Sequence, residues 1–248
     1  MKTCANLSLL FPEAGGLLER IDAAGQAGFT AVEVQFPYDD PANEILSRMA
    51  KYDMQLITMN CPPPNYTGGE RGWAAVPELK DRFRRDFARA LRFAKALGVT
   101  RMHIMSGSAE GPEARLTYVE NLRWAAEQAP HMSLLIEPIN RTSMPGYFLC
   151  DFDEAVRILN EVVAPNLSLL FDSFHAAMIE GDIVKVWDRV GHRVTHVQVG
   201  GAPHRHEPEN HDAFFDRLRA DGYGGYVSGE YNPRGLTTDG LSWVKAAT

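Results

Sequence analysis

Short runs of apolar residues recur along the chain, and longer stretches of mixed polarity separate them. A glycine commonly stands just before such a run, as in Ala27-Gly28-Phe29, Leu97-Gly98-Val99 and Asp221-Gly222-Tyr223. Glycine is common at this position because it accepts the left-handed conformation that ends a helix. The apolar runs predict strands near residues 4–8, 31–36, 55–61, 101–106, 133–138, 167–172, 195–199 and 226–231.

The stretches between the predicted strands have the periodicity of amphipathic helices. Between Leu79 and Leu97, for example, apolar residues recur at spacings of three and four. Eight strands that alternate with helices predict an α/β fold, a (β/α)8 TIM barrel in which residues 1–248 form a single domain. Two connections are unusually long, Pro62 to Pro77 and Gly200 to Asn210, and long loops after barrel strands commonly carry functional residues.

Composition narrows the class of protein. With 45% hydrophobic residues the chain can bury a large core, and its net charge of -7 disfavours binding to the phosphates of a nucleic acid. The cysteines, Cys4, Cys61 and Cys150, are far apart and form no CxxC motif, which predicts neither a disulfide framework nor a zinc site. The apolar run from Leu7 to Phe11 is too short to span a membrane. We expect a cytoplasmic protein without a nucleic-acid or membrane partner, and a homo-oligomer stays open.

Polar side chains stand at the ends of four consecutive predicted strands. Glu137, Asp172 and Glu230 follow or end apolar runs, and Gln198 takes the matching position on the seventh strand. A strand inside a parallel barrel is usually apolar throughout, so these positions need an explanation. Because the carboxyl ends of barrel strands meet at one face, the four side chains should converge where barrel enzymes have their active sites.

Three carboxylates that lie close together repel one another unless a cation neutralises them. Carboxylate and amide oxygens favour a hard divalent metal, Mg²⁺ or Mn²⁺, over zinc. For any one of these acids, a helix cap or a pair with an arginine is an equally good explanation. Four polar residues at matching positions favour the metal site.

Several motifs resemble the hydroxypyruvate isomerase family, which belongs to the xylose-isomerase-like barrels. The resemblance runs nearly end to end. The motifs Ile136-Glu137-Pro138-Ile139-Asn140 and Gly69-Glu70-Arg71-Gly72 are fairly specific for the family when they occur together. The motifs are Ile136-Glu137-Pro138-Ile139-Asn140, Phe171-Asp172-Ser173-Phe174-His175, His196-Val197-Gln198-Val199, Gly229-Glu230-Tyr231, Pro203-His204-Arg205 and Gly69-Glu70-Arg71-Gly72.

The resemblance implies an isomerase that interconverts hydroxypyruvate and tartronate semialdehyde. It implies that two glutamates, Glu137 and Glu230, donate and accept the proton. It also implies a metal held by these two residues together with Asp172 and Gln198. Such a reaction passes through an enediolate, whose two oxygens a divalent ion can stabilise.

Further residues are candidates for binding a hydroxy-oxo-acid substrate. Arg71 and Arg205 lie in the two long loops, and a guanidinium can bind a carboxylate with two parallel hydrogen bonds. His175 can hydrogen-bond a substrate oxygen or support a neighbouring residue. Glu70 can orient Arg71 or line the pocket. Glu33, on the second strand, can point into the barrel mouth or pair with a buried cation.

Other functions fit parts of the same pattern. A 2-oxo-tetronate isomerase or a keto-sugar epimerase would use the same site. An endonuclease of abasic DNA shares the barrel, but it needs a basic face that the net charge does not suggest. A noncatalytic sugar-binding barrel is the remaining alternative.

Overall fold

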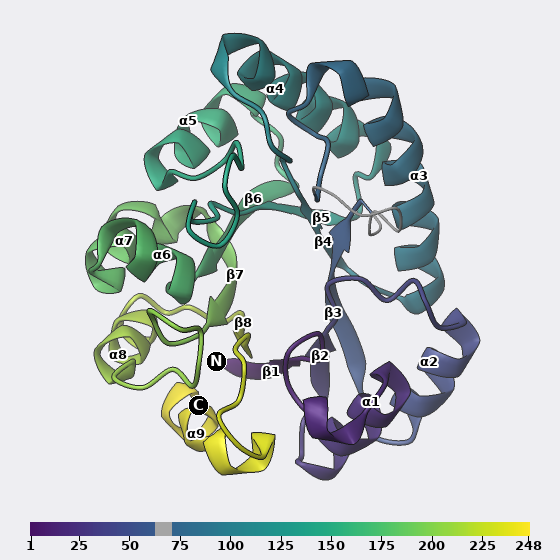
Figure 1. Ribbon diagram of the computed structural model, residues 1–248, viewed down its shortest axis with the longest axis vertical. Coiled ribbons are helices and arrows are strands. Elements are labelled where there is room, and N and C mark those ends of the chain that lie inside the picture. Colours follow the sequence, from purple (N-terminus) through teal and green to yellow (C-terminus); the bar gives the residue numbers. More distant parts are fainter. Residues whose placement is uncertain (63–70) are drawn as a thin grey trace.

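Eight parallel strands close into a barrel in the order of the sequence, and the helices form a ring around it (Figure 1). The computed structural model describes residues 1–62 and 71–248. This architecture confirms the predicted (β/α)8 TIM barrel. The strands are β1 (Lys2–Asn6), β2 (Ala31–Glu33), β3 (Gln55–Cys61), β4 (Arg101–Ile104), β5 (Ser133–Ile136), β6 (Leu167–Asp172), β7 (Val194–Val199) and β8 (Tyr226–Gly229).

The helices of the described residues lie outside the strands (Figure 1). The α-helices are α1 (Leu17–Gln26), α2 (Ala42–Ala50), α3 (Lys80–Leu97), α4 (Gly111–Gln128), α5 (Phe152–Val162), α6 (Ser173–Glu180), α7 (Ile183–Val190), α8 (Asp212–Ala220) and α9 (Ser242–Ala247). Residues 1–62 and 71–248 also contain four short 3-10 helices, η1 (Pro12–Ala14), η2 (Pro77–Leu79), η3 (Gly191–Arg193) and η4 (Thr237–Gly240).

Local sequence explains where these elements begin and how they pack. The Asp151 side chain caps α5 by accepting a hydrogen bond from the backbone N–H of Glu154, which satisfies one of the free donors of the first turn. Gly98 ends α3 at a φ of 70°, as the glycine pattern predicts. Phe171 of β6 stacks on Phe214 of α8, and their ring centroids are 5.4 Å apart. Such aromatic contacts fix the helices against the outside of the barrel.

Strand bounds differ from the sequence prediction in places that have a physical cause. β1 ends at Asn6 because the chain turns there, and the backbone N–H groups of Leu9 and Leu10 donate to the Asn6 carbonyl. A third long connection, from Glu137 to Asp151, was not predicted. In the sequence, the first apolar residues of this connection look like a continuation of β5. In the structure β5 ends at Ile136, and the connection runs at the end of the barrel and leads into α5.

The cysteines Cys4, Cys61 and Cys150 are free, in agreement with the sequence prediction. Among the described residues, no helix has both the length and the apolar character that crossing a membrane requires.

Candidate functional site

The four polar residues predicted at the strand ends do converge at one end of the barrel. Glu137 follows β5, Asp172 ends β6, Gln198 lies on β7 and Glu230 follows β8. Asp172 is paired in register with Gln198 across the β6–β7 ladder. Each of the four residues is at most 6% exposed, so the barrel buries three carboxyl groups close to one another.

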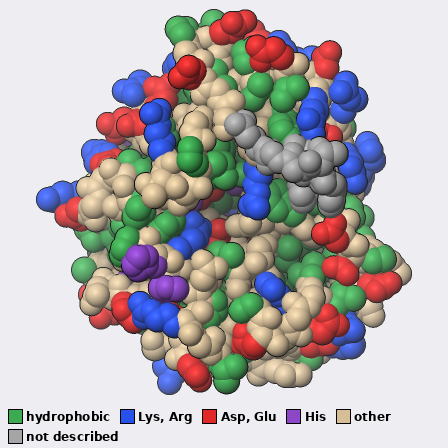
Figure 2. Space-filling model, in the orientation of Figure 1, with side chains coloured by type: hydrophobic (Ala, Val, Ile, Leu, Met, Phe, Trp, Pro, Cys, Tyr) green, Lys and Arg blue, Asp and Glu red, His purple; other side chains and the backbone are tan. Residues whose placement is uncertain are grey.

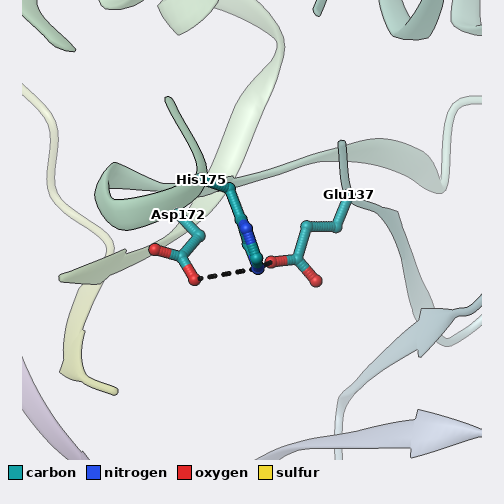
Figure 3. Close-up of side chains that lie close together, drawn as sticks. All are labelled: Glu137, Asp172 and His175. Carbon is teal, nitrogen blue, oxygen red and sulfur yellow. Dashed lines mark ion pairs between the residues drawn. The ribbon is translucent and has the colours of Figure 1, made fainter. Parts of the chain in front are cut away.

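His175 joins this cluster from the first turn of α6. Its Nε2 lies 3.8 Å from Glu137 Oε1 and 3.7 Å from Asp172 Oδ2, and Figure 3 shows the three side chains pointing toward one another. One ligand atom from each of these residues lies within 4.8 Å of the others, a spacing that can hold a metal ion. The sequence placed His175 among the substrate-binding candidates, and the structure also makes it a possible ligand.

Arg205 reaches into the same cluster from the long connection after β7. Its Nη2 donates to Asp172 Oδ2 at 2.6 Å and to Glu230 Oε1 at 2.7 Å. Its Nη1 lies 3.1 Å from His175 Nε2, and the guanidinium lies 4.8 Å from the centroid of the Phe174 ring. The arginine therefore offsets part of the negative charge of the buried carboxylates.

Burial sets the ionisation of the site. Burial raises the pKa of Glu137 well above its usual range, and the neighbouring Asp172 and Glu230 raise it further. The pKa of Glu230 is raised to about 8 by burial, although Arg205 acts in the opposite direction. Burial lowers the pKa of His175 to about 4. At neutral pH this imidazole is therefore uncharged, and its Nδ1 accepts a hydrogen bond from the backbone N–H of Asn140.

Two buried oxygen atoms at the site have no hydrogen-bond partner among the described residues. They are Oε1 of Gln198 and Oε2 of Glu230. Buried hydrogen-bond acceptors nearly always have a partner in proteins, so two buried oxygens without one suggest a ligand that supplies positive charge. The donor set therefore fits a metal bound through oxygen.

A cavity of about 230 Å³ opens beside these residues. Glu137, Gln198 and Glu230 line it together with three of the predicted substrate-binding residues, His175, Arg205 and Arg71. The other walls include the apolar side chains of Leu9, Met105, Ile139 and Met144. Two of these, Ile139 and Met144, come from the connection that was not predicted.

Arg71 lines the same cavity as Glu137 and Glu230, and no ion pair joins it to these carboxylates in the described part of the chain. It is exposed, and its guanidinium lies 5.3 Å from the centroid of the Phe36 ring. The predicted binding residue Glu70 lies outside the described residues.

The sequence prediction missed four polar residues of the cavity wall, Gln35, Asn60, His103 and Ser143, and two of them contact the glutamates. Gln35 donates from Nε2 to Glu230 Oε1 at 2.8 Å, and His103 Nδ1 lies 3.4 Å from Glu137 Oε2. One feature of the sequence could have identified Gln35. It follows Glu33 by two residues in a mostly apolar segment, and alternate residues of a strand point to the same side. The Nε2 of His103 has no hydrogen-bond partner among the described residues.

Comparison with known proteins agrees with this fold. The family description "xylose isomerase-like TIM barrel" matches residues 21–247. The 2-oxo-tetronate isomerase of Cupriavidus necator is 39% identical, over 97% of this chain and 96% of that protein. The hydroxypyruvate isomerase of Escherichia coli K12 is 34% identical, over 98% of each chain.

A crystal structure described as AP endonuclease, family 2, from Brucella melitensis superposes with a TM-score of 0.93. It is 38% identical and covers 99% of this chain and 98% of that one. The matched family and the two named enzymes each extend over nearly the whole chain. The chain therefore belongs to the xylose isomerase-like TIM barrel family and is an isomerase of the group that contains these two enzymes.

Proposed function

We propose that this isomerase moves the carbonyl group between neighbouring carbons of a small hydroxy-oxo-acid, with metal assistance, and interconverts hydroxypyruvate and tartronate semialdehyde. The observation that carries the proposal is the pair Glu137 and Glu230. These glutamates directly follow β5 and β8, are buried, and line one cavity. The pKa of each is raised by burial toward the range in which a carboxyl group can both accept and donate a proton.

The reaction needs two proton transfers at carbon. One glutamate, as a carboxylate, takes a proton from C3 of hydroxypyruvate, and an enediolate forms. The other, as a carboxylic acid, returns a proton to C2, and the hydroxyl proton on the C3 oxygen moves to the C2 oxygen. The molecular formula does not change. Glu137 and Glu230 are our acid/base pair, and the pose of the substrate decides which of them acts first.

We infer that Glu137, Asp172, Gln198 and Glu230 hold a divalent metal. Their oxygen donors favour Mg²⁺ or Mn²⁺, and the unpaired buried oxygens of Gln198 and Glu230 support this choice. A bound divalent ion would supply positive charge where the enediolate develops negative charge. His175 is near enough to Glu137 and Asp172 to be an additional ligand or to hydrogen-bond the substrate.

The carboxylate of a hydroxy-oxo-acid requires a cationic partner. Arg205 and Arg71 line the cavity, and we propose that they bind this carboxylate, since a guanidinium matches it with two parallel hydrogen bonds. We propose that Glu70, the residue before Arg71 in the sequence, orients Arg71 or lines the pocket. The neutral imidazole of His175 can hydrogen-bond a substrate oxygen without adding charge.

A four-carbon substrate is the second candidate, because the Cupriavidus necator relative is named for 2-oxo-tetronate. Substrate profiling separates the two. The protein, supplied with Mg²⁺, is incubated in parallel with hydroxypyruvate, 2-oxo-tetronate and a keto-sugar, and products are followed by proton NMR. We expect turnover of hydroxypyruvate that is lost in Glu137→Gln. Turnover of 2-oxo-tetronate alone would replace the first candidate with the second, and epimerisation of the keto-sugar alone would contradict both.

We propose a small molecule, rather than a nucleic acid, as the partner of the site. The net charge of the chain is -7, and on the face that Figure 2 shows, acidic and basic side chains are interspersed instead of forming one basic patch. A strand-nicking assay on duplex DNA with an abasic site is the direct check. Nicking by the wild type that disappears in Glu137→Ala would contradict the proposal.

A further inference from the structure

A fourth carboxylate, Glu33 of β2, is buried in the barrel beneath the proposed metal ligands and is 1% exposed. Three polar side chains surround it. Asn6 Nδ2 and Gln198 Nε2 both donate to Glu33 Oε1, at 2.9 and 2.7 Å. His196 Nε2 lies 2.6 Å from the other oxygen, Oε2. The strand that carries Glu33 contributes none of the four proposed metal ligands, yet it contacts one of them directly.

The contact with Glu33 determines which way the Gln198 amide faces. A carboxylate oxygen that receives N–H groups acts as an acceptor, so the amide nitrogen, and not the amide oxygen, must turn toward it. The oxygen stands on the other branch of the same planar amide and therefore faces away from Glu33. Gln198 lines the cavity, and this oxygen has no hydrogen-bond partner among the described residues.

We propose that Glu33 is a positioning residue that holds the Gln198 amide with its oxygen, rather than its NH2 group, toward the metal. The inference rests on the proposed metal site. The two ends of an amide have nearly the same shape, so the walls of the pocket cannot select one orientation by packing alone. The NH2 end cannot coordinate a cation, whereas the oxygen end can. A single buried acceptor, the Glu33 carboxylate, is therefore enough to select one of the two orientations of the Gln198 amide.

A purely structural role for Glu33 makes a different prediction. If the residue serves only to pair with His196, or to add negative charge near the site, its loss affects metal binding whatever side chain stands at position 198. If it orients an amide, its loss matters only while position 198 carries an amide. A carboxylate at that position has an oxygen on both branches and needs no orientation.

The test is therefore a double-mutant cycle of Glu33→Met and Gln198→Glu. The measured quantity is the dissociation constant for Mn²⁺, from titration calorimetry with the metal alone, and thermal unfolding of each metal-free variant checks that it is folded. We expect Glu33→Met to weaken Mn²⁺ binding by about tenfold or more when Gln198 is present. In the Gln198→Glu background we expect a loss of about threefold or less.

Two further variants complete the design. Glu33→Gln keeps an acceptor oxygen for Gln198, so it should bind Mn²⁺ nearly as well as the wild type. Asp221→Leu is the matched control, because Asp221 also accepts an N–H group from a buried side chain, Trp187 Nε1 at 2.8 Å, but it precedes β8 and so lies at the opposite end of the barrel. It should leave Mn²⁺ binding unchanged. If Glu33→Met does not fold, Glu33→Asp replaces it in both backgrounds, since the shorter side chain withdraws the acceptor from Gln198.

Equal losses of Mn²⁺ affinity in the two backgrounds, or no loss in the first, would overturn the positioning role. A wild-type protein that binds no Mn²⁺ would overturn the proposed metal site and this inference together. The two failures are distinguishable because only the second one affects the wild type.

Discussion

Replacing Arg205 with methionine should destabilise the metal-free protein strongly. The substitution removes a guanidinium, on a side chain that is 15% exposed, which donates to the buried Asp172 and Glu230 at 2.6 and 2.7 Å, and it leaves both carboxylates without that partner. Breaking a buried ion pair by removing one member costs about 3–5 kcal/mol. For a chain of this size each kcal/mol lowers Tm by about 2–4 °C, so Arg205→Met should lower Tm by roughly 10 °C.

Arg189→Met is the matched control for this measurement. Arg189 also contacts two carboxylates, Glu180 at 2.7 Å and Asp153 at 3.4 Å, but its side chain is 42% exposed. Exposed pairs of this kind contribute about 0–1 kcal/mol. The assay is differential scanning calorimetry in low salt with a chelator. Since a divalent ion would neutralise the same carboxylates as Arg205, saturating Mg²⁺ should raise the Tm of Arg205→Met more than that of the wild type. Equal losses of Tm in the two variants would refute this reasoning.

Three further predictions concern the site and the core. Glu137→Gln and Glu230→Gln should each lower kcat by about 10²–10⁴-fold with an unchanged circular dichroism spectrum, and a fall of less than about tenfold in either variant would argue against an acid/base role. Chelation should abolish turnover, and added Mg²⁺ or Mn²⁺ should restore it; full activity in the chelated protein would contradict the metal site. Phe171→Ala should reduce the free energy of unfolding by about 3–5 kcal/mol in urea titration, because Phe171 is fully buried between β6 and α8; a cost below about 1 kcal/mol would contradict that packing.

The fold could be predicted from the sequence because the same pattern of apolar and amphipathic segments repeats along the chain. Eight apolar runs separated by amphipathic stretches predict the barrel even when individual bounds are displaced, as for β1. The connection from Glu137 to Asp151 escaped prediction because Pro138 and Ile139 extend the apolar run of β5. Periodicity alone does not distinguish a strand from an apolar loop that covers the end of the barrel.

The convergence of the site was also predictable, because parallel strands of a barrel place their carboxyl ends together. Contacts between distant residues were not. Nothing local indicates that Gln35 reaches Glu230, or that Glu33 is shared by Asn6, His196 and Gln198, since these contacts depend on how the closed barrel turns its interior side chains. Composition and motif can suggest that a polar residue is buried, but only the three-dimensional structure identifies its partner.

The proton transfers assigned to Glu137 and Glu230 can be tested by running the reaction in D2O. Hydroxypyruvate is converted with Mg²⁺ present, and proton and deuterium NMR locate the label in tartronate semialdehyde. Transfer through two glutamates that exchange their protons with solvent predicts deuterium at C2 of the product. Product that forms without deuterium at C2 would show that the hydrogen removed from C3 is the one that arrives at C2, by a direct shift or on a single base, and it would contradict the assignment of the two transfers to two glutamates.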